Sequence, residues 1–204
     1  GQTYLNRSST PAEFRKNAGG HKIIHIGTHA EYNNINPERS RLIFAKTPLV
    51  SADTNSLFLY DIYNCNVSSD LTLLTACETG RPGYQDGEGM VSLAHAFNYA
   101  GSRSILTGLW KIDEHSSSQI TESFIRHLKE GLPSDEALRK AKLDYLGGNP
   151  EKLLAPAYWS GLVLMGKPGS IQFEQPGLNP WWWVLAGTGL LLTLFILYRK
   201  KNRH

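Results

Sequence analysis

Short apolar runs alternate with amphipathic segments along the first 170 residues of the chain. An apolar run of four to eight residues is typical of a buried strand, and apolar residues three and four apart are typical of a helix. These patterns predict strands at residues 22–27, 56–63, 71–76, 104–109 and 161–165, where 56–63 is a strand or a sheet edge. They predict helices at residues 89–99, 116–130 and 134–146. Alternation of strand and helix indicates an α/β fold with a mostly parallel sheet flanked by helices.

Two of the predicted helices have recognisable ends. Ser116 and Gln119 have the spacing of a capping box at the start of the helix at 116–130, and Gly131 follows its last residue. The helix at 134–146 has Pro133 immediately ahead of it and Gly147 immediately after it. These positions predict where the two helices begin and end.

The last part of the sequence differs in character from the rest. Residues 181–198 include 18 consecutive residues without a charge, and three tryptophans lie at the start of this run. This is the length that a membrane-spanning helix requires, and aromatic residues commonly mark the membrane boundary. The alternative is a buried core helix, but the preceding Gly-, Pro- and Asn-containing linker favours a single-pass anchor. The predicted organisation is a domain at 1–170, a linker at 171–180, a transmembrane helix at 181–198 and a basic tail at 199–204.

Charge is concentrated at the carboxyl terminus. The chain has 21 Lys and Arg and 18 Asp and Glu, and four of the basic residues lie among the last six positions. The remainder is close to neutral and has no basic stripe, so nucleic acid is not an expected partner. By the positive-inside rule, the basic tail predicts a cytoplasmic carboxyl terminus and a periplasmic domain. The alternative is a cytoplasmic domain on a tail anchor.

The motifs of several functional classes are missing from the sequence. Two cysteines are too few for a disulfide scaffold, and there is no CxxC pair or HExxH sequence that would indicate a metal site. A nucleotide-binding fold is also disfavoured, because there is no GxGxxG or P-loop. We therefore expect a chain that needs neither a metal nor an organic cofactor.

Two predicted strand ends carry residues that can do chemistry. His29 follows the strand at 22–27, and Cys77 follows the strand at 71–76. If these strands are parallel neighbours, both residues leave the sheet at the same edge, where imidazole can take the thiol proton. The backbone N–H groups of Ala30 and Cys77 could then stabilise an oxyanion. The alternatives are a buried core thiol and a structural histidine, and both are common.

Four stretches, IIHIGTHAEYN, LLTACETG, DGEGMVSLAHAFNYAGSRSILTGLWKID and PAYWSGLVLMG, resemble the CHAT family of caspase-like cysteine peptidases. The resemblance covers roughly residues 10–166 and implies a caspase-hemoglobinase type of α/β fold. It assigns the catalytic histidine to His29 and the nucleophile to Cys77, and Ala30 stands where caspases have Gly. It also implies that the family's domain begins before Gly1, that tetratricopeptide repeats precede it in the full-length chain, and that the source is bacterial.

The substrate pocket is predicted from two further segments. Asp86 and Glu88 lie in an acidic, glycine-containing loop, and their alternative role is to cap the following helix. Trp110 and Asp113 follow the strand at 104–109, and in the caspase arrangement this region lines the pocket for the residue before the cut bond. Asp113 would favour Lys or Arg there, and its alternative role is to start the next helix.

Two functions from different classes remain. The first is a membrane-anchored cysteine endopeptidase that cleaves a protein or peptide substrate, possibly after a basic residue. The second is a catalytically silent scaffold or interaction module at the membrane. Cys65 has no histidine near it in the sequence, and we expect it to be structural.

Overall fold

The structure is a computed structural model that describes residues 1–33, 35–45, 55–75, 83–85, 89–91, 93–110 and 112–173. Residues Gly1–Ile171 form one compact unit. The second unit, Gln172–His204, is described only at its first two residues. The predicted transmembrane helix at 181–198 and the basic tail lie outside the described residues. Within the described part of the chain, no helix has the length and apolar character that crossing a membrane requires.

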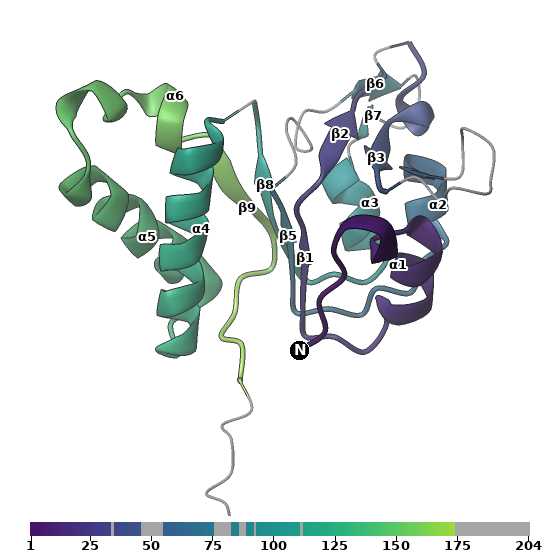
Figure 1. Cartoon of the computed structure of the whole chain (residues 1–204), viewed down its shortest axis with the longest axis horizontal. Helices are drawn as coiled ribbons and strands as arrows, with labels where there is room; N and C mark the ends of the chain where they lie inside the picture. The colour runs from purple at the N-terminus through teal and green to yellow at the C-terminus, as the bar shows by residue number, and fades with distance from the viewer. Residues whose placement is uncertain are drawn as a thin grey trace, which may run out of the picture. The chain divides into compact units, whose positions relative to one another are not determined.

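A four-stranded sheet lies at the centre of the first unit (Figure 1). Its strands are β1 (Ile23–Ile26), β5 (Leu71–Leu74), β8 (Ser104–Gly108) and β9 (Leu162–Gly166), in that order across the sheet. The first three are mutually parallel, and β9 runs antiparallel to β8. The prediction of an α/β fold with a mostly parallel sheet flanked by helices is confirmed.

Three helices lie on one side of this sheet: α1 (Pro11–Asn17), α2 (Leu59–Tyr63) and α3 (Leu93–Tyr99) (Figure 1). Alternate residues of β1, Ile24 and Ile26, are buried in the apolar core that these helices share with the sheet. Burial of such side chains is the main favourable term in folding, and each contributes roughly 1.5–3 kcal/mol. The core therefore fixes which face of β1 points inward.

Two longer helices, α4 (Glu114–Lys129) and α5 (Ser134–Gly148), lie on the other side of the sheet (Figure 1). The buried side chains of α4 include Ile120, Phe124 and Leu128, which recur every four residues along one face. The opposite face of α4 carries exposed charged residues. The helix predicted at 116–130 is therefore present, with one apolar face buried.

The start of α4 differs from the prediction. The N-cap is Asp113, whose carboxylate accepts hydrogen bonds from the backbone amide of Ser116 at 2.9 Å and from its hydroxyl at 3.0 Å. The capping box predicted for Ser116 and Gln119 is wrong, because Asp113 satisfies the free amide that such a box would cap. Gly131 follows the helix with φ of 92°, as its position predicted. Gly147, expected just after α5, lies inside it.

A small antiparallel sheet was not predicted. It consists of β2 (His29–Glu31), β3 (Arg41–Ile43) and β4 (Ser56–Phe58). The strand predicted at 56–63 is therefore correct only for its first three residues, because α2 begins at Leu59. The Asp61 carboxylate accepts a hydrogen bond from the Phe58 amide and holds the helix start.

The helix predicted at 89–99 is also correct only in part. A hairpin of β6 (Gly83–Gln85) and β7 (Gly89–Val91) precedes α3, which begins at Leu93. Glycine is a poor helix former, so the segment that starts at Gly89 extends and pairs instead. The remaining elements are short: the 3₁₀ turns η1 (Asn6–Ser8), η2 (Pro37–Arg39) and η3 (Glu151–Leu153), and the helix α6 (Pro156–Trp159).

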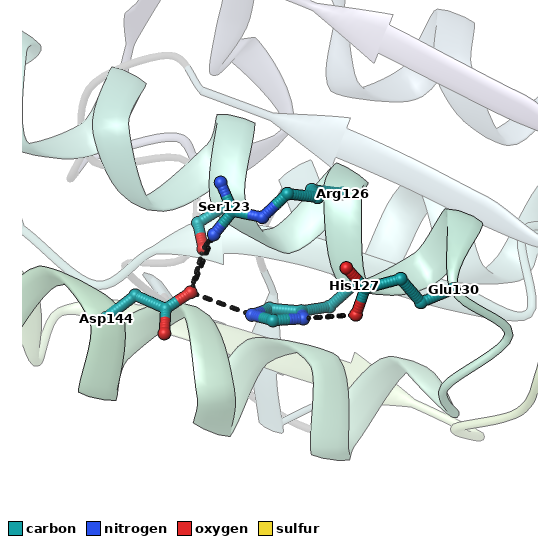
Figure 2. A network of polar contacts seen from close by, with 5 residues as sticks. All are labelled: Ser123, Arg126, His127, Glu130 and Asp144. Atoms are coloured by element: carbon teal, nitrogen blue, oxygen red, sulfur yellow. Dashed lines mark hydrogen bonds and ion pairs between the residues drawn. The ribbon is translucent and has the colours of Figure 1, made fainter.

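A polar network joins α4 to α5 (Figure 2). The His127 ring lies between two carboxylates, with Nδ1 at 2.9 Å from Glu130 and Nε2 at 2.8 Å from Asp144. Asp144 also accepts hydrogen bonds from Ser123 and, at 2.8 Å, from Arg126. The His127 side chain is only 12% exposed. When its imidazole is protonated, the positive charges of His127 and Arg126 balance the negative charges of the Glu130 and Asp144 carboxylates.

This network makes stability depend on pH. The hydrogen bond to Glu130, followed by that to Asp144, raises the pKa of His127 above its ordinary 6.5. The folded chain therefore binds this proton more tightly than the unfolded chain. The stabilisation is complete below pH 6.5 and is lost as the pH rises through the raised pKa of His127.

We expect the His127→Gln variant to lose this pH dependence and up to about 1 kcal/mol of stability at pH 6, since the carboxylate partners are partly solvated. Urea unfolding at pH 6 and pH 8.5 measures both effects. His21→Gln is the control, because no ion pair of His21 is found in the part of the chain that the structure describes. An equal change of stability with pH in wild type and His127→Gln would contradict the assignment.

Candidate functional site

The carboxyl ends of β1 and β5 meet at one edge of the central sheet. The two strands are parallel neighbours, and Ile26 of β1 is the Cα partner of Leu74 of β5. His29 comes three residues after Ile26, and Cys77 comes three residues after Leu74 in the sequence. The condition set for a dyad, that the two strands are parallel neighbours, is met. Cys77 itself lies outside the described residues, so the dyad remains a prediction.

His29 is the first residue of β2 and is paired with Ile43 of β3. Only Gly27 and Thr28 separate β1 from β2, and the Thr28 hydroxyl donates to the backbone carbonyl of Ile43. The chain thus passes directly from the central sheet to the small sheet. His29 is exposed at the point where the small sheet begins. The short connection ties the backbone of His29 to two sheets, which restricts where its ring can lie.

Ala30, the predicted oxyanion donor, is the next residue of β2 and is paired with Leu42. Its side chain is half-buried against the apolar core. Because its backbone is that of an ordinary β-strand, alanine meets no steric penalty here. The position therefore has no need for the glycine found in caspases.

A cavity of about 960 Å³ opens beside His29. It extends from the carboxyl ends of β1 and β5 to the exposed side of α4, and Thr28, Thr75 and Trp110 also line it. A cavity of this size is within the range of natural ligand sites. The structure therefore brings His29 and Trp110, two of the predicted site residues, to one cavity.

His25 is a cavity residue that the sequence analysis missed. Its Nε2 atom lies 3.0 Å from the Thr75 hydroxyl, which links β1 to the end of β5. Desolvation by the surrounding protein lowers the pKa of His25. The available signal was the alternation of β1, since burial of Ile24 and Ile26 in one core requires His25 to face the other side of the sheet.

Trp110 is held in a fixed position at the cavity. Its indole N–H donates to the backbone carbonyl of Ala157 at 3.0 Å. The ring lies against Gly161, where an added Cβ would come within 2.5 Å of the indole Cε2 atom. The side chain is 38% exposed, so one part of the ring is packed and another is open to the cavity.

The other residues predicted to form the substrate pocket are Asp113, Asp86 and Glu88. Asp113 caps α4, and the hydrogen bonds from the Ser116 amide and hydroxyl lower the pKa of its carboxyl group. Its alternative role in starting the helix is therefore present in the structure, and its role in substrate binding is still a prediction. Asp86 and Glu88 lie outside the described residues. Across the described ranges, no cluster of His, Cys, Asp and Glu side chains suits a metal ion.

Cys65 follows α2 and packs beside the core. Its thiol donates to the backbone carbonyl of Asp61 at 3.4 Å. Burial raises the pKa of Cys65, which leaves the sulfur a poor nucleophile. These contacts agree with the structural role that we expected for it.

Comparison with known proteins shows the family. The model of the CHAT domain matches residues 1–167. The mouse (Mus musculus) protein Tetratricopeptide repeat protein 28 is 26% identical over 106 residues, which are 52% of this chain and 4% of that protein. The chain thus corresponds to a small part of the length of this relative. Because the family model covers most of the sequence, the chain belongs to the CHAT domain family, whose fold is caspase-like.

Proposed function

We propose that this chain is a cysteine endopeptidase that uses Cys77 and His29 to cleave protein substrates. The observation that carries the proposal is the register of β1 and β5. Its paired residues, Ile26 and Leu74, precede the two proposed catalytic residues by the same three positions. The cavity beside His29 supplies the space that a polypeptide requires.

The proposed reaction has two halves. His29 takes the proton of the Cys77 thiol, and the thiolate adds to the carbonyl carbon of the peptide bond. The backbone N–H groups of Ala30 and Cys77 hold the oxyanion that forms. The C–N bond then breaks, and His29 gives its proton to the leaving amine. Water, deprotonated by His29, hydrolyses the thioester and restores the thiol.

Incubation of the full chain with an unfolded protein such as casein tests this proposal, with products identified by mass spectrometry. We expect fragments from the wild type and none from the Cys77→Ala variant. Equal amounts of product from both proteins would contradict the proposal. The same products report whether Lys or Arg precedes the cut bond, as the position of Asp113 in the sequence predicted.

A silent interaction module is the second candidate. The match to a protein named for its tetratricopeptide repeats favours it, because such a protein combines this kind of sequence with a repeat region. Under this alternative the thiol of Cys77 would not be activated, and the chain would act by binding a partner.

The reactivity of the two cysteines separates these candidates. We expect a fluorescent iodoacetamide to label Cys77 at least about tenfold faster than Cys65, because a thiolate reacts faster than the half-buried thiol of Cys65, whose pKa is raised. Peptide mapping after timed labelling measures both rates in one sample. The Cys65→Ala variant checks that the fast signal belongs to Cys77. Labelling of Cys77 no faster than Cys65 would favour the silent module.

We also propose that residues 181–198 anchor the chain in a bilayer, with the domain in the periplasm and the carboxyl terminus in the cytoplasm. The uncharged run and the basic residues after it support this orientation. After expression in bacteria, we expect the full chain to stay with membranes during alkaline extraction. A chain ending at residue 180 is expected to be released. Release of both chains would contradict the anchor, and reporter fusions at each end would distinguish it from a cytoplasmic domain on a tail anchor.

A further inference from the structure

The exposed side of α4 forms one wall of the cavity. Ser118, Glu122, Ile125 and Lys129 all line the cavity and recur every three or four residues, so they form one stripe along the helix. The helix begins just after β8, at the edge of the sheet where His29 lies, and runs back along the sheet (Figure 1). The stripe therefore leads away from the proposed catalytic residues.

Neighbouring charges on this wall are already compensated. Arg126 and Glu130 also line the cavity, but Arg126 is bonded to Asp144 and Glu130 to His127 (Figure 2). Glu122 and Lys129 are exposed, and no ion pair of either is found in the part of the chain that the structure describes. Glu114, at the start of the helix, also lines the cavity and is exposed, and no ion pair of it is found among the described residues. The wall thus presents free negative charges at its beginning and near its middle, and a free positive charge near its far end.

The spacing of these charges sets the chemistry of an occupant. Glu122 and Lys129 are two helical turns apart, about 10 Å along the axis. In an extended polypeptide, side chains on the same face that are four residues apart are separated by about 13 Å, which flexible Lys and Glu side chains can adjust to. Between the two charges, half-buried Ile125 offers an apolar contact.

From this pattern we infer that the cavity binds an extended segment of the substrate that carries one basic and one acidic side chain four residues apart. The inference rests on the proposed function, because the cavity begins at His29, one of the proposed catalytic residues. The basic side chain pairs with Glu122, and the acidic side chain pairs with Lys129. Glu122 lies eight residues into the cavity wall from Glu114, or about 12 Å, so the recognised pair lies several residues from the cut bond.

Binding of short peptides to the full chain tests the inference without requiring cleavage. The protein carries Cys77→Ala, and the probes are labelled eight-residue peptides of Gly, Ser and Leu with Lys/Glu, Lys/Lys or Glu/Glu four residues apart. By fluorescence polarisation at low salt, we expect the Lys/Glu peptide to bind about fivefold more tightly than either other peptide.

Reversing one charge should change which peptide is preferred. We expect Glu122→Lys to prefer the Glu/Glu peptide and Lys129→Glu to prefer the Lys/Lys peptide. The matched controls Glu151→Lys and Lys167→Glu make the same changes of net charge at exposed positions away from the cavity, and we expect them to keep the preference for Lys/Glu. Circular dichroism confirms that each variant is folded.

The outcomes distinguish this inference from the proposed function. If Glu122→Lys and Lys129→Glu keep the preference of their controls, the inferred recognition is overturned, even when the wild type cleaves casein. If the preferences switch as expected but the wild type never cleaves, the recognition stands and the peptidase proposal fails.

Discussion

Replacement of Cys77 by alanine is expected to lower kcat/KM for protein cleavage by at least about 10³-fold, because it removes the nucleophile. His29→Ala is expected to lower it by about 10²- to 10⁴-fold, because the general base is lost. Initial rates of casein cleavage over a range of substrate concentrations measure both. The double variant should be no worse than the poorer single variant, since the two residues act as one unit.

The control for this prediction is the other cysteine. Cys65 lies beside the core, with its thiol bonded to the Asp61 carbonyl. We expect Cys65→Ala to keep kcat/KM within about threefold of the wild type while losing some stability. A large loss of activity in Cys65→Ala, or full activity in His29→Ala, would contradict the roles given to these residues.

The second large effect concerns the core that supports β1 and β5. Phe97 of α3 is fully buried at 0% exposure, and its ring lies edge-on to Phe14 of α1 with centroids 6.1 Å apart. We expect Phe97→Ala to lower the free energy of unfolding by about 3–5 kcal/mol, because it leaves a cavity and removes an aromatic contact. That loss is a large fraction of the 5–15 kcal/mol typical of a domain. Urea unfolding measures it.

Tyr99→Ala is the matched control, two residues further along the same helix. Tyr99 is 72% exposed, and its ring contact is with Tyr63, 5.1 Å away. Replacing it removes an aromatic side chain of similar size from the surface, and we expect a loss of about 1 kcal/mol or less. Equal losses for Phe97→Ala and Tyr99→Ala would show that α3 does not pack as the structure describes.

The central sheet could be predicted because its strands are marked locally. β1 and β5 are short, mostly apolar runs, and all four residues of β5 are buried. The long helices were equally clear, since the stripe of Ile120, Phe124 and Leu128 has helical spacing over several turns. In both cases the order of apolar and polar residues within one segment determines which side chains are buried. These elements could therefore be predicted without knowledge of distant contacts.

The small sheet could not be predicted in the same way. β2, β3 and β4 have three residues each, too few to show a period of two, and their pairing joins segments that are distant in the sequence. The start of α4 was misplaced for a different reason, because two local capping patterns overlap there. Ser116 and Gln119 matched a capping pattern, but Asp113 supplied the hydrogen bond through an equally common one.

For the candidate site, the sequence located His29 and Trp110, and the structure shows that both line one cavity. The cavity's charged wall was not predicted. Whether Glu122 or Lys129 is free depends on the partners of Arg126 and Glu130, and Asp144 of α5 is one of them. Residue spacing along α4 does not show that contact, so the charge pattern of the cavity wall could not be predicted from the sequence.

The dependence of Cys77 alkylation on His29 and on pH tests the central claim most directly. With Cys65 replaced by alanine, the rate of iodoacetamide labelling is measured from pH 6 to pH 8 in proteins with and without His29→Ala. A nearby imidazolium keeps sulfur as the thiolate in acid, so the rate at pH 6 should stay within about threefold of that at pH 8. Without the imidazole it should fall by more than about tenfold, as for an ordinary thiol. Identical pH profiles with and without His29 would contradict the pairing of these two residues.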